Sequence, residues 1–424
     1  MCWVAVTFTS SYIQYAYCSP SRNSFMTGRR PDTTRVWEFI DHFREAGVGA
    51  DWISLPQYFK KNNYLTLGGG KLFHPSSANE NIGMADNDYP ASWTPEFPYF
   101  ENQPKNGPHK CLNAFEPAEL TKNRGTWCAA EVGKDAVVLS DQKIRQNCLE
   151  HLRLAKNLTQ DTAESPYDNF FVGCGFHKPH VPWIAPGEFF DELPIKSWED
   201  YPLAADPYAP VGMPDVAWHP PADVGGMGET PSFNGTFNAT RSRQYRRAYD
   251  AAVSYQDYNI GMVLAELARL GLEESTVVAL FGDHGWQLGE HDTWAKMTNF
   301  ELATRIPLFI KAPHKPNSKG EKSNALVEAV DIYPTLVELA GLAPPSSMGQ
   351  ALNGTSLAPL FENPTRKVKD AAFSQFAKVS TFNVTPHFTR NETITAKRTH
   401  VTRDSLFLHA SRWVSRTHHL FSIQ

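Results

Sequence analysis

A cysteine with an arginine four positions later offers the clearest chemistry in this sequence. The segment CSPSRNSFMTGRRPDTTR starts at Cys18, with Ser19 as a candidate helix N-cap, Pro20 at an early helical position and Arg22 one turn on. A helix N-terminus and a guanidinium beside a thiol would form an anion site around a nucleophile. A thiolate phosphatase would need its arginine six positions after the cysteine. Position 24 is Ser24, so that chemistry is excluded.

Two further segments carry cationic and imidazole side chains beside apolar or glycine-rich stretches. GGGKLFHP puts Lys71 and His74 in a glycine-rich turn, where a lysine can neutralise an anion and a histidine can bond a nucleophile. FFVGCGFHKPHVPW places His177 after an apolar run, at the strand end where open α/β sheets bind ligands. We interpret His177 as a general acid or an anion contact, and His180 as an exposed loop residue.

The stretch TVVALFGDHGWQLGEHDTWAKMTNF combines an apolar strand with a polar exit. The strand delivers Asp283 and His284 to its end, and Gly285 permits a tight turn. Trp286 would pack against either a sugar ring or the core, two alternatives that the sequence leaves open. Lys296 follows in the same loop.

Together these segments resemble the sulfatase family. C-x-P-S-R followed by T-G-R is the family signature, and matching segments extend from about Tyr15 to about Gln375. The resemblance implies that a formylglycine-generating enzyme oxidises Cys18 to formylglycine, whose hydrate attacks sulfur and whose second hydroxyl then expels sulfate. It also implies catalytic roles for Cys18, Arg22, Lys71, His74, His177 and Lys296.

A calcium ion is a further implication of the resemblance, with residue 18, Asp283 and His284 as ligands. Calcium takes six to eight oxygen ligands. The family supplies an Asp-Asp pair before the nucleophile, whereas none of the residues before Cys18 is acidic. We therefore expect weak calcium binding and leave open whether the chain as written is active.

The substrate implied by the resemblance is an anionic sugar. The match is greatest to the branch that removes the 2-O-sulfate from iduronate in heparan sulfate and dermatan sulfate. In that branch Arg35 and Lys296 are candidates for binding the uronate carboxylate, with Trp286 nearby. The alternatives are a sulfatase for another sugar, a related phosphodiesterase (disfavoured by cysteine in place of Ser or Thr), and a non-catalytic remnant that binds sulfated glycans.

Alternating strands and helices predict an α/β fold. Short apolar runs at Asn169–Cys174, Thr276–Phe281 and Arg305–Lys311 suit strands buried on both faces. Helices are expected at Ser242–Leu270, with Tyr258 and Met262 on its apolar face and Gly271 at its end, and at Ala329–Ala340. The resemblance implies an alkaline-phosphatase-like mixed sheet flanked by helices. We divide the chain into a catalytic domain at 1–345, lacking its first strand, and a partial, smaller C-terminal α+β subdomain at 346–424.

Composition limits the partners. The net charge of -5 gives no basic field for nucleic acid, so an anionic polymer would bind only in a local basic pocket. No apolar run reaches the roughly 18 residues that span a membrane. The first 17 residues suit a strand rather than a signal peptide, so we expect the natural start to lie upstream.

Cysteines and glycosylation sequons point to the secretory route, and hence to a lysosomal or secreted protein. Cys111 and Cys128 flank a turn-rich loop and form either a disulfide or two free thiols, whereas Cys174 is most simply a buried core residue. The six N-x-[ST] sequons are at Asn157, Asn234, Asn238, Asn353, Asn383 and Asn391.

Overall fold

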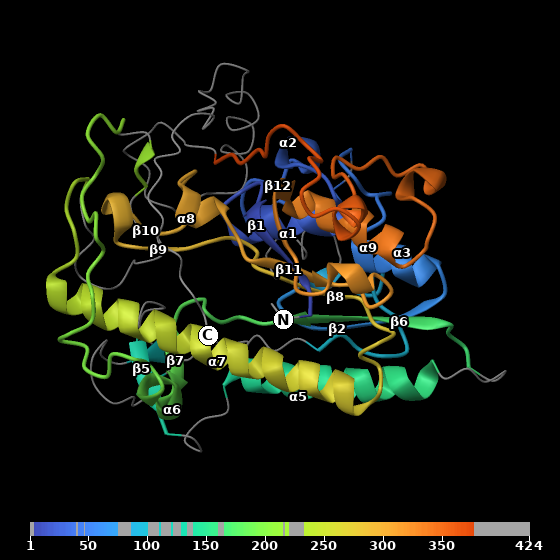
Figure 1. Cartoon of the computed structure of the whole chain (residues 1–424), viewed down its shortest axis with the longest axis horizontal. Coiled ribbons are helices and arrows are strands. Elements are labelled where there is room, and N and C mark those ends of the chain that lie inside the picture. The colour runs from blue at the N-terminus through green and yellow to red at the C-terminus, as the bar shows by residue number, and fades with distance from the viewer. Residues whose placement is uncertain are drawn as a thin grey trace.

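The computed structural model describes residues 4–39, 41–45, 47–74, 86–100, 110–111, 120–121, 129–133, 139–159, 165–214, 217–219 and 233–376. Its main sheet has four strands in the order β12-β1-β11-β8 (Figure 1). β1 (Val6–Tyr12) runs parallel to β12 (Lys322–Glu328) and antiparallel to β11 (Leu308–Lys311), which is antiparallel to β8 (Val278–Phe281). The predicted mixed sheet is thus confirmed, as is the strand expected near the start of the chain.

A second, parallel pair of strands leads into the lysine turn. β2 (Tyr64–Gly70) pairs along its whole length with β6 (Asn169–Gly175). At the end of β2, Gly70 has φ +79°, and a Cβ there would lie 2.1 Å from the carbonyl oxygen of Gly175. Only glycine permits this close approach, which brings the chain out of the strand at Lys71.

The remaining strands are short and pair two by two. β3 (Lys110–Cys111) pairs with β4 (Leu120–Thr121), β5 (Ala129–Val132) with β7 (Trp183–Pro186), and β9 (Gln287–Leu288) with β10 (Trp294–Ala295). The last pair forms the turn that carries Lys296.

Helices lie on both sides of the strands. In the view of Figure 1, α3 and α9 lie above β2 and β6, and α5 and α7 lie below these two strands, where α5 packs against β2, β6 and α7. The helices are α1 (Cys18–Thr27), α2 (Pro31–Thr34), α3 (Leu55–Lys61), α5 (Ser140–Leu158), α6 (Gly187–Asp191), α7 (Ala239–Arg269), α8 (Glu301–Thr304) and α9 (Ile332–Leu339).

The two predicted helices are confirmed with shifted ends. α7 begins three residues before the predicted start, because the side chain of Asn238 accepts the backbone N–H of Arg241 at 2.9 Å and caps the helix. It ends before Gly271, whose φ of +69° suits the residue after a helix. The other predicted helix is a 3-10 turn at Ala329–Asp331 followed by α9.

The expected buried face of α7 is wrong toward its C-terminal end. Tyr258 and Met262 are 45% and 39% exposed, whereas Gln256 and Asn259 are buried. Asn259 is buried because its side chain accepts a hydrogen bond from Arg145 of α5 and donates to the carbonyl of Tyr255. A pattern that counts apolar residues alone cannot find a helix contact made by polar groups.

The strands are less buried than expected. All four residues of β8 and most of β6 are only partly buried. β8 lies at the edge of the main sheet, where β11 is its only partner strand among the described residues. The expectation of burial on both faces is therefore wrong for β8.

Two hydrophobic clusters anchor the segments that matter for the site. One joins β1 and β11 to α1 and α9 through residues such as Phe8, Phe25 and Ile332. The other packs Trp183, Tyr245 and Trp294 between β7, α7 and the β9–β10 turn. The start of α1 and the turn that carries Lys296 are thus each anchored to a packed core.

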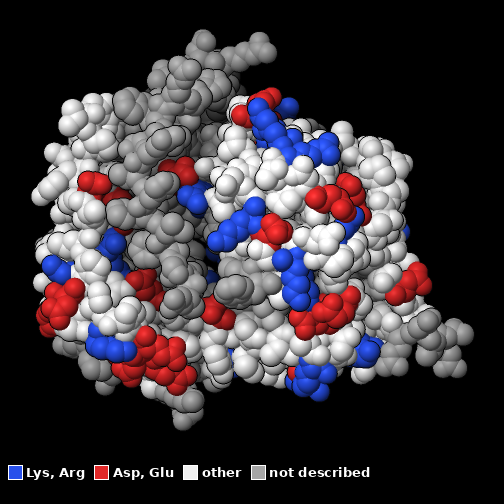
Figure 2. Space-filling view, viewed as in Figure 1, with Lys and Arg blue, Asp and Glu red and all other residues white. Residues whose placement is uncertain are grey.

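Surface charge is mixed on the face seen in Figure 2, where acidic and basic side chains alternate. This face shows no continuous basic area, as the net charge of -5 predicts. Among the described residues, no helix is both long and apolar enough to cross a membrane.

Candidate active site

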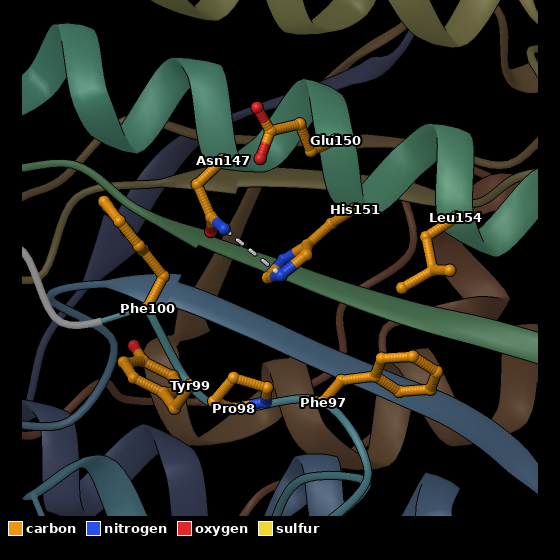
Figure 3. Close-up of a pocket in the computed structure, with 8 residues that line it drawn as sticks. All are labelled: Phe97, Pro98, Tyr99, Phe100, Asn147, Glu150, His151 and Leu154. Atoms are coloured by element: carbon orange, nitrogen blue, oxygen red, sulfur yellow. Dashed lines mark hydrogen bonds between the residues drawn. The ribbon is translucent and has the colours of Figure 1, made fainter.

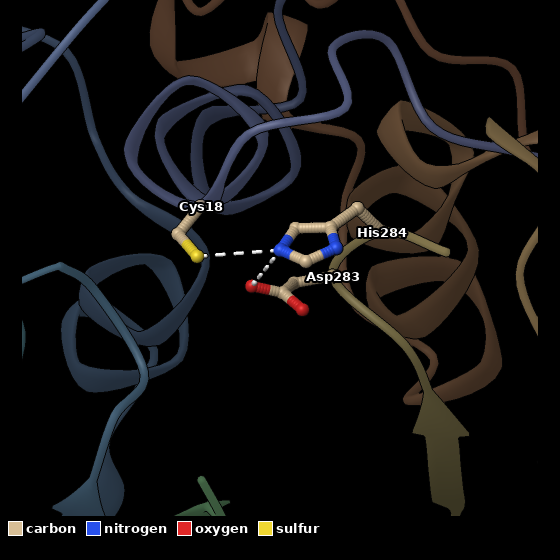
Figure 4. Close-up of side chains that lie close together, drawn as sticks. All are labelled: Cys18, Asp283 and His284. Atoms are coloured by element: carbon tan, nitrogen blue, oxygen red, sulfur yellow. Dashed lines mark hydrogen bonds and ion pairs between the residues drawn. The ribbon is translucent and has the colours of Figure 1, made fainter. Parts of the chain in front are cut away.

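Cys18 lies at the first position of α1, pointing toward the end of β8 (Figure 4). The helix begins there because Tyr17 is extended and its carbonyl accepts the N–H of Ser21 at 3.0 Å. Tyr17 is therefore the N-cap residue, and the expectation that Ser19 fills this position is wrong. Cys18 is 1% exposed.

Two buried lysines converge on the sulfur of Cys18. Lys296 Nζ lies 2.9 Å and Lys71 Nζ 3.6 Å from Sγ. They come from the β9–β10 turn and the end of β2, and both side chains are buried. Two ammonium groups held out of water around one atom form a strong site for an anion.

Arg22 ties together the three elements that meet here. Its Nε and Nη2 donate to Asp283 Oδ2 at 3.0 and 2.9 Å, and its Nη1 donates to the carbonyls of Lys71 and Leu72. One guanidinium thus joins α1, the end of β2 and the end of β8. The pKa of the Asp283 carboxyl is about 2, because Arg22 and His284 outweigh the effect of burial.

Two histidines contact Cys18. His284 Nδ1 donates to the carbonyl of Gly285 at 2.8 Å, and His180 Nδ1 donates to the carbonyl of Val181 at 2.6 Å, because a carbonyl only accepts. His284 Nε2 then lies 3.2 Å from Sγ and accepts from Lys296 at 3.1 Å. The His180 side chain also hydrogen-bonds Cys18.

The expectation that His180 is an exposed loop residue is therefore wrong. The loop after β6 folds back, so His180 reaches the cluster, while the backbone N–H of His177 donates to Asp141 at 2.6 Å. The pKa of His177 lies well below its ordinary value because of burial and the charge of Lys71. The H-x-x-H spacing offered both histidines, but it did not show which one turns inward.

His74 lies beside Lys71 on an aromatic surface. Its ring stacks on Phe39 at 4.4 Å between centroids, and Phe39 packs against Tyr17 at 4.3 Å. Burial and then Lys71 hold the pKa of His74 well below its ordinary value. No sequence motif indicated that Phe39 lies at the site.

Of the three predicted substrate residues, Lys296 lies in the cluster, Trp286 borders it and Arg35 lies outside it. The ring of Trp286 lies 6.4 Å from the ring of His284 and 5.5 Å from Lys296 Nζ, and it also packs edge-on against Trp183. Trp286 thus borders both the cluster and the second core. Arg35 is exposed at the end of α2, and it is not among the described neighbours of Cys18.

The predicted metal ligands come together, but they do not suit calcium. Donor atoms of Cys18, Asp283 and His284 lie within 4.8 Å of one another. Only Asp283 offers carboxylate oxygens, and it already pairs with Arg22. One carboxylate, one imidazole and two neighbouring ammonium groups do not make the oxygen cage that calcium needs. No chemical step is therefore assigned to a metal below.

The expectation that Cys174 is an unpaired core residue is wrong. Cys174 of β6 forms a disulfide with Cys148 of α5, so Cys174 is not a simple core thiol. The predicted pair Cys111–Cys128 lies outside the described side chains. Four sequon asparagines are exposed, and the other two, Asn383 and Asn391, lie outside the described residues; the exposed ones are Asn157, Asn234, Asn238 and Asn353.

A separate hollow lies between α5 and residues 97–100 (Figure 3). Residues 97–100 line one side with three aromatic rings, and on the α5 side Asn147 and His151 bond each other at 3.3 Å. None of the residues that contact Cys18 lines it, so it does not belong to the cluster.

A family model described as Sulfatase matches residues 4–342, which is most of the chain. The chain therefore belongs to the sulfatase family. A second family model, the C-terminal region of N-sulphoglucosamine sulphohydrolase, matches residues 289–402. Neither match tests the predicted division at residue 345.

Two of the curated relatives are iduronate 2-sulfatases. Those of Mus musculus and Homo sapiens are each 34% identical to this chain over 80% of its length. The chain spans only 63% and 64% of these two proteins. The phosphonate monoester hydrolase of Silicibacter pomeroyi is a solved structure with the same fold, at a TM-score of 0.63 and 21% identity, covering 87% of this chain and 72% of that one.

A second solved structure is a protein in complex with its substrate D-glucosamine-2-N,6-O-disulfate. It has a TM-score of 0.61 and 18% identity, and covers 90% of this chain and 78% of that one. These likenesses confirm the alkaline-phosphatase-like fold.

Proposed function

We propose that this chain hydrolyses a sulfate ester, with Cys18 converted to formylglycine as the group that receives the sulfuryl. The observation that carries the proposal is the convergence of Lys71 and Lys296 on the side chain of residue 18. A sulfate monoester keeps its negative charge at every working pH. Two buried ammonium groups beside a nucleophile stabilise that charge, which is what sulfuryl transfer needs.

The reaction runs in two steps on the aldehyde hydrate. One hydroxyl of the hydrate loses its proton as its oxygen bonds to sulfur, the bond from sulfur to the sugar oxygen breaks, and the sugar oxygen takes a proton. The second hydroxyl then loses its proton, the aldehyde carbonyl re-forms, and the bond from carbon to the sulfate oxygen breaks. Water hydrates the aldehyde again, so no water has to attack sulfur.

The side chains have separate tasks in this scheme. Lys71 and Lys296 bind sulfate oxygens, and Arg22 fixes the start of α1 against Asp283. His74 is assigned to the hydrate, and His177 to proton donation to the leaving sugar oxygen, as the family resemblance implies. Both have a depressed pKa, so each works as a neutral imidazole that has to receive a proton before it can donate one.

The substrate class we propose is 2-O-sulfated iduronate at the end of heparan sulfate or dermatan sulfate chains. Its support is the 34% identity to proteins named iduronate 2-sulfatase. Trp286 beside Lys296 offers an apolar ring and a cation, which suit a sugar ring with a carboxylate. Arg35 would have to bind the carboxylate from outside the described cluster.

A second candidate function is binding of sulfated glycans without turnover. The observation that favours it is the single carboxylate among the candidate metal donors, which does not suit calcium. The cationic cluster would still attract a sulfate group. Only a measurement of turnover distinguishes sulfate ester hydrolysis from glycan binding.

We further propose a secreted or lysosomal location. A disulfide between Cys148 and Cys174 is stable in an oxidising compartment, and four exposed sequon asparagines are open to glycan attachment. The formylglycine-generating enzyme would be met along the same route.

The test uses the chain expressed in cells that contain the formylglycine-generating enzyme. Mass spectrometry of the peptide with residue 18 reports conversion to the aldehyde. Release of methylumbelliferone from 4-methylumbelliferyl iduronate 2-sulfate at acidic pH, with and without calcium, reports turnover, and Cys18→Ala is the control. We expect conversion, and turnover that Cys18→Ala abolishes.

The outcomes separate the candidates. A plain thiol at position 18 in such cells would rule out the proposed mechanism. Conversion without turnover, together with binding of heparin fragments that Lys71→Met and Lys296→Met weaken, would favour the glycan-binding function. Turnover only of other sulfated sugars would keep the reaction and replace the substrate.

A further inference from the structure

The β9–β10 turn delivers Lys296 to the cluster along an unfavourable backbone path. Ala295 and Met297, the two neighbours of Lys296, both have φ +71°, a left-handed conformation that residues other than glycine seldom adopt. Earlier in the turn, His291 and Asp292 have φ of +57° and +61°. Such a path persists only where the surrounding structure holds it.

Arg246 of α7 holds the β9 side of this turn. Its Nη1 donates to the carbonyl of Leu288 at 3.0 Å and to Glu290 Oε1 at 2.6 Å. Glu290 Oε2 accepts the backbone N–H of Leu288 at 2.7 Å. The two side chains are 14% and 23% exposed, so their ion pair is largely shielded from water. One charge-assisted pair thus bonds both backbone groups of the last residue of β9.

The strand pair passes this anchor on to Lys296. Ala295, the residue before Lys296, pairs with Gln287 of β9. The backbone N–H of Met297, the residue after Lys296, donates to the carbonyl of Ala16 at 3.0 Å. Lys296 therefore lies between one contact with β9 and one with the segment that leads into α1. The place of its ammonium group depends on both.

We propose that Arg246 is a positioning residue that acts through Lys296. With Glu290 it holds β9 on α7, and β9 in turn keeps the Lys296 ammonium against the group at position 18. This inference rests on the proposed sulfatase function, in which Lys296 binds a sulfate oxygen. Arg246 bonds the turn, so its effect on the reaction is indirect.

The first experiment compares Arg246→Met and Arg246→Lys in the formylglycine form of the full chain. Removing the guanidinium frees β9, and a displacement of about 1 Å at a reacting group costs about 100-fold in rate. We expect kcat/KM of Arg246→Met to fall by about that factor. Arg246→Lys keeps a cation beside Glu290, so we expect it to recover part of the rate.

Two further variants guard this comparison. Glu290→Gln keeps the shape of the acceptor and removes its charge, and we expect it to lower kcat/KM less than Arg246→Met does. Arg243→Met is the matched control, because Arg243 also lies on α7 but donates to the carbonyl of Tyr201. It should leave kcat/KM unchanged. Equal losses in Arg243→Met and Arg246→Met would overturn the proposal.

A double variant tests whether Arg246 acts through Lys296. If Arg246 works by placing this lysine, then Arg246→Met in the Lys296→Met background should cost little more than Lys296→Met alone. Costs that simply multiply would overturn the proposal, as would full activity of Arg246→Met.

Hydrogen exchange gives a readout that does not need activity. The N–H of Leu288 reports the anchor itself, and the N–H of Met297 reports the backbone beside Lys296. Both should exchange faster in Arg246→Met than in the natural chain, and neither should change in Arg243→Met. Faster exchange at Leu288 alone would overturn the proposal, because the loosened anchor would then not reach Lys296.

The two proposals fail in different ways. An inactive natural chain contradicts the sulfatase function, and faster exchange at both amides would then still support the role of Arg246 in placing Lys296. Unchanged exchange at Met297 in a folded Arg246→Met protein overturns the role of Arg246 whatever the activity.

Discussion

Neighbouring charges outweigh burial at Cys18. Burial alone raises the pKa of a thiol, yet Lys296, Lys71 and His284 together hold the pKa of Cys18 well below its ordinary value. The side chain is therefore surrounded by groups that favour a negative charge at that position. The same surroundings would favour the charged oxygens of a sulfuryl group bonded to residue 18.

At the residue scale we predict that Lys296→Met removes most of the activity. Lys296 is 2% exposed and touches both Cys18 and His284, and methionine keeps its length without the charge. Loss of one preorganised cation should lower kcat/KM by about 100-fold or more. Steady-state kinetics on the formylglycine form measure this.

Lys311→Met is the matched control for that prediction. Lys311 is also buried, but it pairs with Glu273 near the start of β8, and we expect it to change stability rather than kcat. Equal losses of kcat/KM in both variants would show that Lys296 contributes only to folding.

The sequence predicted some of the site residues and missed others. Cys18, Arg22, Lys71, Asp283, His284 and Lys296 come together as the motifs indicated. The inward turn of His180 and the contact of Asp141 with the His177 N–H were not recognised, because they depend on the path of a loop and on backbone N–H groups. Residue types and their spacing do not predict the path of a loop or the partners of its backbone N–H groups.

At the element scale, the turn before Lys296 is fastened to a distant loop by Asp292. Its Oδ2 accepts the backbone N–H of Asn234, and its carbonyl accepts the indole N–H of Trp218 at 2.9 Å. Its Oδ1 is buried and has no partner among the described residues. Burial raises the pKa of Asp292 to about 6, with the N–H of Asn234 opposing.

This raised pKa predicts a stability that falls as pH rises. The folded chain holds a proton that the unfolded chain has lost above about pH 4, so stability drops between about pH 4 and pH 6 and stays lower above that. Asp292→Asn removes the charge and keeps an acceptor. We expect it to raise the melting temperature at pH 7, by the equivalent of about 1 kcal/mol after solvent screening, and to leave it unchanged at pH 4.

Thermal unfolding at the two pH values measures the effect. A variant that is stabilised equally at pH 4 and pH 7 would contradict the assignment, because the gain would then not come from the charge.

Element prediction succeeded where the pattern was long and apolar. The ends of α7 fell within three residues of the prediction, because Asn238 and Gly271 are chemically suited to helix ends. The face of α7 was partly wrong, because Asn259 is buried with polar contacts to Arg145 and to the carbonyl of Tyr255.

At the scale of the whole molecule, segments far apart in sequence lie side by side in the fold. β1 lies between β11 and β12, about 300 residues later, a pairing that local periodicity cannot predict and that only the family resemblance implied. The last described segment, which ends at residue 376, returns to the start of the chain, where the backbone N–H of Gln375 donates to the carbonyl of Gln14 at 3.0 Å.

Lys369 anchors this returning segment on two fully buried carboxylates. Its Nζ lies 2.8 Å from Glu328 Oε2 and 2.6 Å from Asp331 Oδ2, and Arg30 also pairs with Glu328. Burial raises the pKa of Asp331, and Lys369 opposes that effect. Removing the lysine would leave the Asp331 carboxylate buried without a cation.

We therefore predict that Lys369→Met destabilises the chain by about 3 kcal/mol, the range for breaking a buried pair, as measured by urea unfolding. Lys367→Met is the matched control, because Lys367 pairs with Asp370 in solvent and we expect no measurable change. If both variants unfolded at the same urea concentration, the returning segment would not be held by the buried pair. A loss confined to Lys369→Met would show that the buried carboxylates of Glu328 and Asp331 hold the returning segment through charge rather than through apolar packing.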